Sequence, residues 1–396
     1  MPEEKMHFKD YRSGMLTNGI ERAAHRALLY STGLDREDLG KPMIAVVNSF
    51  TEMVPGHFHL RELADFVKQG IIEAGGIPRE FSTIAICDGI CQGHKGMSYP
   101  LPSRELIADS AEYMIEAHQF DGMVMLPGCD KIVPGMLMAA MRLNIPAIVI
   151  PGGPMLPGKY KDMEAITLTD MRELIGRTQT GRLTEDELMK IEEAALPGVG
   201  TCSMLGTANT MSCLAEALGM SLPGCGLAHA VSAKKRRIAK QSGRRIVAMV
   251  KEDLTPRKIM TREALRNAIR VSMAMGASTN STLHLPAIAH EAGIHITLDD
   301  FDELSREIPY LCNIKPSGQY PLSVLEEQGG VPAVMKALER KLDLEQMTVS
   351  GKTVGENLAG VELVENDVIF SLDHPKKPEG GLAILHGNLA PKGAVV

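Results

Sequence analysis

The sequence predicts an α/β protein: a parallel-sheet N-terminal domain with helical additions, followed by the start of a β-rich C-terminal domain. Up to Ile150, short apolar runs bounded by Gly or Pro alternate with longer amphipathic stretches. Such runs are typical of strands in a parallel sheet, and alternation of strand and helix is typical of an α/β fold. Near the end of the chain, short β-like runs among many turn residues predict the second domain.

Apolar segments give the expected elements of the sheet. We expect strands at Met43–Asn48, Phe81–Ile86, Gly122–Leu126 and Ala147–Ile150. Between them the pattern predicts helices at His59–Ala74, Ser103–Ala117 and Pro134–Leu143. Ser103, followed by Glu105, indicates an N-cap with an acidic residue in the first turn.

The middle of the chain, from about Asp162 to Leu342, is predicted to be mostly helical. Within it, Thr184 and Glu187 predict a capping box. The basic run Lys234–Arg237 is interpreted as a solvated helix face, because a binding patch is not expected in an acidic protein. We expect helices at Thr184–Ala194, Thr207–Gly219, Ala228–Gly243, Thr261–Met275 and Thr279–Ala292.

The last stretch, Val349–Val396, contains the β-like runs VIFSL and LAIL and many turn residues. We place a domain boundary near Pro375–Pro378. The predicted domains are an α/β domain at 1–375 and the first part of a β-rich domain at 376–396. Because the second piece is too short for a domain, we expect the chain to stop as that domain begins.

Composition excludes several classes of protein. The chain has 396 residues and a net charge of -7, which argues against a nucleic-acid partner. No apolar run approaches the ~18 residues of a membrane span. Seven scattered cysteines, an odd number, favour thiols in a reducing cytoplasm over a secreted disulfide framework. No G-x-G-x-x-G follows a predicted strand, which counts against a nucleotide-binding oxidoreductase.

Two loops at the carboxyl ends of predicted strands carry Cys next to Asp, and ligands of α/β sheets bind at such loops. Cys87-Asp88 follows the second strand, and Cys129-Asp130-Lys131 follows the third. Thiolate suits iron–sulfur clusters or zinc, whereas carboxylate suits Mg²⁺. One loop could therefore hold a soft metal on Cys129 and a hard metal on Asp130, with Asp88 as a second carboxylate.

Each of these residues also has a purely structural interpretation. A buried Cys with a surface Asp and Lys is the default for a single Cys-Asp-Lys tripeptide, and Asp88 before Gly89 can simply start a turn. Cys202 lies in a small-residue loop before a predicted helix, where the helix dipole stabilises thiolate. A capped helix entrance with a buried Cys202 is the alternative.

Several segments along the chain have distinctive amino-acid sequences. The segments are Gly40-Lys41-Pro42 through Asn48-Ser49-Phe50, CDGICQGHKGM, LPSRELIADS, GCDKIVPGMLMA, GGPM, TCSMLGTANTM, GASTNSTLHL, NIKPSG and GGLAILHGNLAP. In this order they resemble the dihydroxy-acid dehydratase family, which also contains phosphogluconate and sugar-acid dehydratases. The sequences of these segments are more similar to those of the dihydroxy-acid enzymes than to those of phosphogluconate dehydratase.

The resemblance implies a role for each matching residue. Cys129 and Cys202 match the family's iron–sulfur cluster ligands. Asp88 and Asp130 match its Mg²⁺ ligands. Lys131 matches a lysine that is carboxylated on its amine, as N6-carboxylysine, and also binds Mg²⁺. Relatives are dimers, so a homodimer is expected.

Two departures from the family pattern qualify these roles. Gly56 stands where members with a [2Fe-2S] cluster carry a third cysteine, and other members with this Gly are associated with a [4Fe-4S] cluster. The cluster type stays open between the two. Cys87 and Cys91 are candidate third ligands, with local packing as the alternative for each. The catalytic base of the family, and a Glu ligand of Mg²⁺, are expected beyond Val396, so no catalytic base is assigned.

The implied reaction is removal of water from 2,3-dihydroxyisovalerate and 2,3-dihydroxy-3-methylvalerate to give 2-keto acids, in valine and isoleucine biosynthesis. This would make the chain a hydro-lyase of the cytoplasm. The first alternative is a sugar-acid dehydratase of the same family, acting on gluconate or arabinonate. The second is an inactive, truncated binding or assembly protein.

Overall fold

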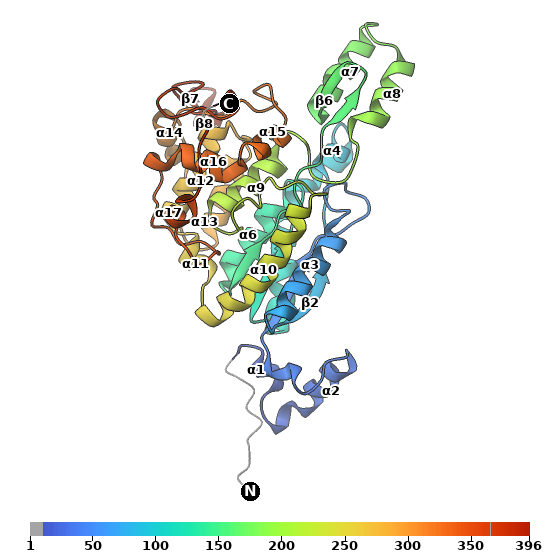
Figure 1. The fold of residues 1–396 in the computed structure, drawn as a ribbon, viewed down its shortest axis with the longest axis vertical. Helices are drawn as coiled ribbons and strands as arrows, with labels where there is room; N and C mark the ends of the chain where they lie inside the picture. The colour runs from blue at the N-terminus through green and yellow to red at the C-terminus, as the bar shows by residue number, and fades with distance from the viewer. Residues whose placement is uncertain (1–10, 365) are drawn as a thin grey trace.

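The computed structural model describes residues 11–364 and 366–396, and its centre is a four-stranded parallel sheet (Figure 1). The order of the strands across the sheet is β2-β1-β3-β4, and all neighbouring pairs are parallel. Every residue of β1 and β3 is buried. The α/β class predicted from the sequence is therefore confirmed. The strands are β1 (Met43–Asn48), β2 (Ile77–Ser82), β3 (Gly122–Leu126) and β4 (Ala147–Val149).

The second strand is the one that the sequence misplaced. The predicted strands at β1 and β3 are confirmed at both ends, and β4 is one residue shorter than predicted. The segment Phe81–Ile86 was predicted as a strand, but β2 begins at Ile77 and ends at Ser82. The strand was missed because Pro78 and the polar residues after it do not match the apolar pattern expected of a strand. An edge strand tolerates both, because only one of its sides pairs with the sheet.

Helices cover both faces of the sheet. Between β1 and β2 the chain moves in one direction across the sheet, and between β2 and β4 it moves back, so right-handed connections place α3 on one face and α5 and α6 on the other. Figure 1 shows α10 lying beside α3. The bounds are α3 (Leu60–Glu73), α5 (Pro100–Ala117), α6 (Ile132–Leu143) and α10 (Ala233–Glu252).

The start of α5 differs from the prediction. Ser103 was expected to be the N-cap, but the helix begins at Pro100, and the Ser103 hydroxyl donates to the Pro100 carbonyl at 2.6 Å. Proline is favoured in the first turn because its missing N–H would have no partner there. The prediction placed the helix start three residues too late, because it gave the capping signal of Ser103 more weight than the proline that begins the helix.

Two glycines allow α3 and α10 to pack closely. An added Cβ at Gly70 would lie 2.0 Å from the Lys240 carbonyl oxygen, and one at Gly243 would lie 2.2 Å from the Val67 carbonyl oxygen. Both obstacles are backbone atoms, which cannot move aside as the end of a side chain can. The contact therefore requires glycine on both helices.

Replacing Gly70 with Ala should lower the free energy of unfolding by about 3 kcal/mol, because the added methyl group forces the two helices apart. The matched control is Gly176→Ala in α7 (Leu168–Gln179), where nothing lies within 4 Å of the added Cβ. There the substitution should be neutral or stabilising by about 0.5–1 kcal/mol. Urea unfolding of both variants measures the difference, and equal stabilities would contradict this account of the helix contact.

A large helical region shares one hydrophobic core with the sheet. Thr261 is the N-cap of α12, and α9 begins at Thr207, as predicted. The predicted helix at Ala228–Gly243 begins later and is longer, because Ser232 caps α10. None of the described helices is long and apolar enough to cross a lipid bilayer. The region contains α9 (Thr207–Ala217), α11 (Pro256–Ile259), α12 (Arg262–Met275), α13 (Ser281–His290), α14 (Leu298–Glu307), α15 (Leu322–Glu327), α16 (Gly330–Ala337) and α17 (Val354–Leu358).

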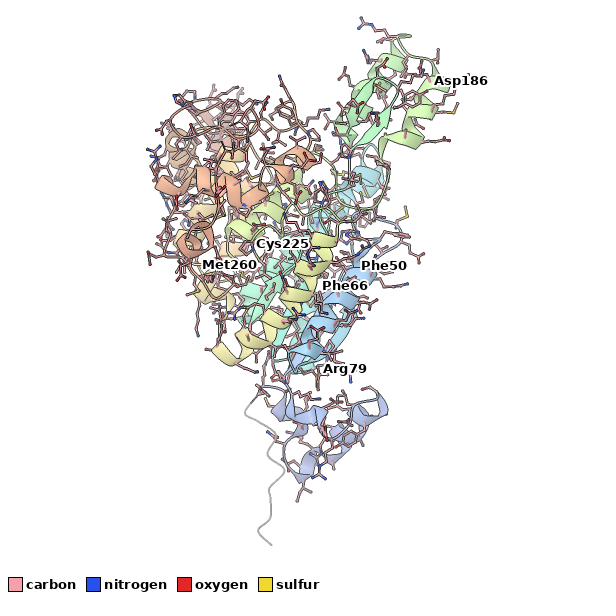
Figure 2. The ribbon with its side chains drawn as sticks, viewed as in Figure 1. Phe50, Phe66, Arg79, Asp186, Cys225 and Met260 are labelled. Atoms are coloured by element: carbon pink, nitrogen blue, oxygen red, sulfur yellow. The ribbon has the colours of Figure 1, made fainter. Side chains whose placement is uncertain are left out.

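The basic run on α10 is not simply a solvated face. Lys235 is fully buried, and its ammonium group donates to the carbonyl oxygens of Pro151 at 2.8 Å and Cys225 at 2.6 Å. Figure 2 labels Cys225 close to α10. For Lys235 the prediction was wrong, because carbonyl groups of two loops replace the water that a lysine normally keeps.

A small lobe projects from the body of the protein (Figure 1), and Asp186, labelled in Figure 2, lies in it. It consists of an antiparallel pair, β5 (Gly158–Tyr160) and β6 (Met163–Ile166), with α7 and α8 (Glu185–Ala195). Its own small core contains Ile166, Leu174, Ile191 and Ala195. Thr184 is the N-cap of α8, and its side chain accepts from the Glu187 N–H at 3.2 Å. The predicted capping box is only half formed, because the Glu187 carboxylate pairs with Lys161 at 2.5 Å and not with the Thr184 N–H.

The two ends of the described chain pack differently. The short helices α1 (Gly14–Thr17) and α2 (Ala23–Ser31) lie apart from the sheet, held by Asp121, which accepts from Ser13. At the other end, β7 (Ile384–Gly387) and β8 (Ala390–Val395) form an antiparallel hairpin whose Ile384 is buried in the main core. The predicted division into 1–375 and 376–396 stays a prediction.

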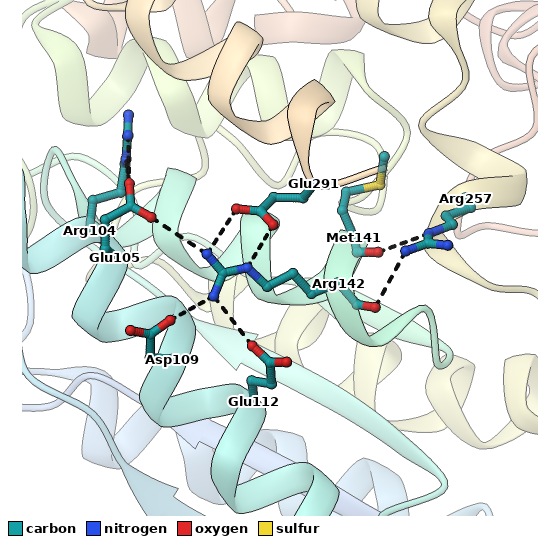
Figure 3. Close-up of polar contacts among 8 residues, drawn as sticks. All are labelled: Arg104, Glu105, Asp109, Glu112, Met141, Arg142, Arg257 and Glu291. Atoms are coloured by element: carbon teal, nitrogen blue, oxygen red, sulfur yellow. Dashed lines mark hydrogen bonds and ion pairs between the residues drawn. The ribbon is translucent and has the colours of Figure 1, made fainter. Parts of the chain in front are cut away.

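One arginine joins three helical segments on the α6 side of the sheet (Figure 3). The Arg142 guanidinium, at the end of α6, donates to Asp109 at 2.6 Å and to Glu112 at 3.3 Å on α5. It also makes a two-pronged contact with Glu291, just after α13, at 2.7 and 2.9 Å. The hydrogen bonds to Glu291 hold the pKa of Arg142 above its usual range. This contact fixes α5 and α6, which flank the loops described next.

Candidate metal centre

The candidate site lies at the carboxyl edge of the sheet, where the direction of the chain reverses. From β1 the chain continues to β2 on one side, whereas β3 lies on the other side of β1. In α/β sheets, ligands bind in the crevice at this point. The loops after β1 and β3 touch there, since a Cβ at Gly128 would lie 2.4 Å from the Gly56 carbonyl oxygen.

His57 fixes the backbone at Cys129. The Cys129 N–H donates to His57 Nε2 at 2.7 Å, and His57 Nδ1 lies 2.8 Å from the Ser49 carbonyl oxygen. These partners require a proton on Nδ1 and none on Nε2. Burial lowers the pKa of His57 to about 4, which agrees with a neutral ring. Sequence reasoning missed His57, because a histidine in a loop gives no sign that it accepts from a backbone amide far along the chain.

The three residues predicted to bind a hard metal lie together. Lys131 Nζ is 2.7 Å from Asp88 Oδ2 and 3.6 Å from Asp130 Oδ2. Asp88 is the first residue of the short helix α4 (Asp88–Cys91), and its other oxygen, Oδ1, is buried with no hydrogen-bond partner. Burial and the nearby charge of Asp88 raise the pKa of Asp130, whereas the charge of Lys131 and a hydrogen bond with Thr207 oppose that rise. Two carboxylates thus share one buried corner with one lysine.

Two of the three thiols of the site belong to the residues that directly precede Asp88 and Asp130. Cys87, Cys129 and Cys202 all line one cavity of about 160 Å³. All seven cysteines of the chain are free thiols. Burial raises the pKa of Cys202 to about 12. The cavity walls are largely apolar, and the other lining residues are Pro55, Gly56, Gly89, Ile90, Met155, Leu168, Leu196, Gly200 and Thr201.

Cys87 contacts Cys129 directly. The side chain of Cys129 hydrogen-bonds to Cys87 and lowers the pKa of Cys87 to about 7. The pKa of Cys129 is raised by this contact and by its complete burial. Cys91, three residues after Asp88, is half-buried and is not among the residues that line the cavity. Of the two cysteines left open by the sequence, only Cys87 meets the other thiols.

Asn209 holds the loop that carries Cys202. Its amide group donates to the carbonyl oxygens of Cys202 and of Met204, the latter at 2.8 Å. Its side-chain oxygen accepts from the Thr201 hydroxyl at 2.6 Å. Asn209 lies in α9 and is fully buried. The sequence placed it in the matching motif but gave it no role.

Replacing Asn209 with Leu should lower the free energy of unfolding by about 2 kcal/mol, because the half-buried carbonyls of Cys202 and Met204 and the buried Thr201 hydroxyl lose their partner. Thermal unfolding measures this loss. Ser212→Ala, which removes a buried hydroxyl from the same helix, should have a smaller effect, since Ser212 bonds only to the Ala208 carbonyl. If the two variants are equally stable, Asn209 does not support the loop.

The donor groups fit a cluster beside a hard cation. In the part of the chain that the structure describes, no three His, Cys, Asp or Glu side chains stand close enough to hold a single metal ion. The three thiols instead surround a cavity, which suits a cluster because its terminal ligands are distributed over several irons. The second group combines two carboxylates with Lys131, whose amine becomes an oxygen ligand once it is carboxylated. The unpartnered Asp88 Oδ1 is the free acceptor that a cation would fill.

Comparison with known proteins identifies the family. The family model described as "Dihydroxy-acid/6-phosphogluconate dehydratase N-terminal" matches residues 41–357. This chain belongs to the dihydroxy-acid/6-phosphogluconate dehydratase family. It is 55% identical over 389 residues to the dihydroxy-acid dehydratase of Methanosarcina barkeri, a match that covers 97% of this chain and 70% of the relative. The dihydroxy-acid dehydratases of Methanothermobacter thermautotrophicus and Halothermothrix orenii are 55% and 52% identical, each with the same coverage.

Membership in the dihydroxy-acid/6-phosphogluconate dehydratase family establishes the class of chemistry. Dehydratases eliminate water from a small-molecule substrate, so this chain belongs with the hydro-lyases. Enzymes of this family use metal cofactors. The site described above contains donor groups for such cofactors at the residues that the sequence singled out: Asp88, Cys129, Asp130, Lys131 and Cys202.

Proposed function

We propose that this chain dehydrates 2,3-dihydroxy carboxylates, such as 2,3-dihydroxyisovalerate and 2,3-dihydroxy-3-methylvalerate, to 2-keto acids in valine and isoleucine biosynthesis. The observation that carries the proposal is the adjacency of the thiol cavity and the Asp88–Lys131–Asp130 corner, in a chain 55% identical to a dihydroxy-acid dehydratase. In the reaction the C2 proton and the C3 hydroxyl leave as water, and the resulting enol tautomerises to the keto acid.

The hard side of the site is proposed to hold Mg²⁺. Asp88 and Asp130 supply carboxylate oxygens, and Lys131 supplies a third oxygen donor as N6-carboxylysine. In that modification the neutral amine nitrogen attacks CO₂, an N–C bond forms, and the amine releases a proton. The change would replace the ammonium now paired with Asp88 at 2.7 Å by an anionic ligand, so a cation would then be needed to balance three negative groups.

The soft side is proposed to hold an iron–sulfur cluster, [2Fe-2S] or [4Fe-4S], on Cys129 and Cys202. When bound, the cluster and Mg²⁺ supply Lewis-acid stabilisation of the leaving hydroxyl and of the charge that develops on the substrate. The residues around them hold the geometry. His57 fixes the Cys129 backbone, Asn209 fixes the Cys202 loop, and the apolar walls of the cavity exclude water.

The assembly and location are proposed as a cytoplasmic homodimer. Tyr99, the N-cap of α5, and Leu106 and Tyr113 within the helix are spaced seven residues apart and are exposed by 61%, 54% and 75%. They form an apolar stripe on one side of the helix, which a second copy of the chain would cover. A Tyr113→Glu variant that stays dimeric in size-exclusion chromatography with light scattering would place the interface elsewhere. We also propose the division into domains at 1–375 and 376–396.

The function is tested by turnover of the full-length protein after anaerobic reconstitution with iron, sulfide and Mg²⁺. We expect 2-keto acid from 2,3-dihydroxyisovalerate at a rate well above that from gluconate or arabinonate. Preference for the sugar acids would identify the sugar-acid dehydratase instead. No product from any of the three substrates would contradict the proposal.

A further inference from the structure

The thiol cavity contains three cysteines, whereas the proposed function above uses only two of them. Cys87 lies in the loop after β2, Cys129 in the loop after β3, and Cys202 in the loop before α9. Although they are far apart in the sequence, all three line the same cavity, and Cys87 contacts Cys129. We propose that Cys87 is a third protein ligand of the iron–sulfur cluster, an assignment that rests on the proposed function.

The two Cys-Asp pairs face each other across the site. In Cys87-Asp88 and in Cys129-Asp130, the thiols meet at the cavity and the carboxylates meet at Lys131. Each loop therefore gives one soft donor to one side of the site and one hard donor to the other. A role in packing alone would explain why Cys87 is partly buried. It would not explain why Cys87, like Cys129, lines the cavity and is followed by an aspartate that lies beside Lys131.

At Gly56, another lining residue of the cavity, a side chain would be tightly placed. A Cβ added at Gly56 would lie 3.1 Å from Cys129 Sγ and 3.1 Å from Thr201 Cγ2, closer than ordinary van der Waals contact. Gly56 therefore lines the cavity with backbone atoms only. The Cys87 sulfur approaches from the other loop, where a Cβ on Gly89 would lie 3.7 Å from it. Cys87 supplies the thiol that Gly56 lacks.

Three cysteines leave one terminal position of the cluster free. A [2Fe-2S] rhomb and a [4Fe-4S] cube each have four terminal ligand positions. Binding of Cys87 is a ligand exchange: its S–H proton goes to solvent, an Fe–S bond forms, and a bound water leaves, with no change in oxidation state. The remaining position would be open to a hydroxyl group of the substrate.

The first test compares Cys87→Ser with Cys91→Ser, a matched control that removes a half-buried thiol from the end of α4, the short helix that Cys87 precedes. After anaerobic reconstitution, Cys87→Ser should retain roughly tenfold less iron and sulfide per chain, or show a shifted EPR spectrum, since loss of a ligand weakens metal binding at least as much as loss of a supporting contact. Cys91→Ser should match the wild type. Wild-type cluster content with an unchanged EPR spectrum in Cys87→Ser would overturn the assignment.

A second test needs no variant and therefore does not depend on folding. The wild-type protein is alkylated with iodoacetamide before and after removal of the cluster, and the modified cysteines are mapped by mass spectrometry. Cys87 should be protected only while the cluster is bound, as Cys129 and Cys202 are. Equal labelling of Cys87 in both states, with Cys129 protected, would overturn this inference alone. Equal labelling of all three would overturn the proposed cluster as well.

Discussion

Replacing Cys129 with Ala should remove the iron–sulfur cluster and reduce turnover by at least about 10²–10³-fold, because the stabilisation of developing charge at such a site is worth that much. Fold stability should change little, since alanine fills most of the space of a small buried thiol. Iron and sulfide analysis, visible absorption and turnover of 2,3-dihydroxyisovalerate measure the effect.

The matched control is Cys213→Ala. Cys213 is also buried, in α9, but it is not among the residues that line the cavity. This variant should retain the cluster and its turnover. If Cys129→Ala keeps the cluster, or if both variants lose it equally, then Cys129 is not a cluster ligand.

Replacing Lys131 with Met should abolish the dependence of turnover on Mg²⁺. It should reduce turnover as strongly as Cys129→Ala does, while the cluster stays in place. In the metal-free protein it should also lower the free energy of unfolding by about 3 kcal/mol, because the buried Asp88 and the half-buried Asp130 would be left without their cation. Activity assays with varied Mg²⁺ and urea unfolding separate the two effects. Carbon-13 NMR of protein equilibrated with labelled CO₂ should show a carbamate signal that this variant lacks.

Lys159→Met provides the comparison for stability. Lys159 pairs with Glu164 on the surface, where both side chains are 67% exposed. Exposed pairs contribute about 0–1 kcal/mol, so this variant should unfold close to the wild type. A carbamate signal that persists in Lys131→Met would show that another amine is modified, and full Mg²⁺ dependence in that variant would remove Lys131 from the metal site.

The centre of the fold could be predicted because its strands are buried on both faces. Met43–Asn48 and Gly122–Leu126 consist mainly of apolar residues, and local pattern alone identifies such segments. The edge strand Ile77–Ser82 has polar residues and a proline, and its place in the sheet depends on pairing with β1. The burial of Lys235 could not be predicted for the same reason, since its partners Pro151 and Cys225 lie in loops distant in the sequence. Local pattern carries no information on such contacts.

The sequence was sufficient to predict which residues supply the donor groups of the candidate site, but not how all of them are positioned in space. The sequence placed Asp88, Asp130 and Lys131 at neighbouring strand ends, and the structure brings them within one buried corner. It could not separate Cys87 from Cys91, because the turn between them decides which thiol reaches the cavity. His57 and Asn209 were also out of reach, since each acts on a backbone group of another loop.

The central claim is that adjacent residues, Cys129 and Asp130, hold a soft and a hard metal centre side by side. Because consecutive Cα atoms are about 3.8 Å apart, the two centres should lie within roughly 10 Å of each other. The direct measurement is EPR spectroscopy of the full-length protein with Mn²⁺ in place of Mg²⁺ and a chemically reduced cluster. We predict magnetic coupling between Mn²⁺ and the cluster that disappears in Cys129→Ala. Two independent, uncoupled signals in the wild type would contradict the account.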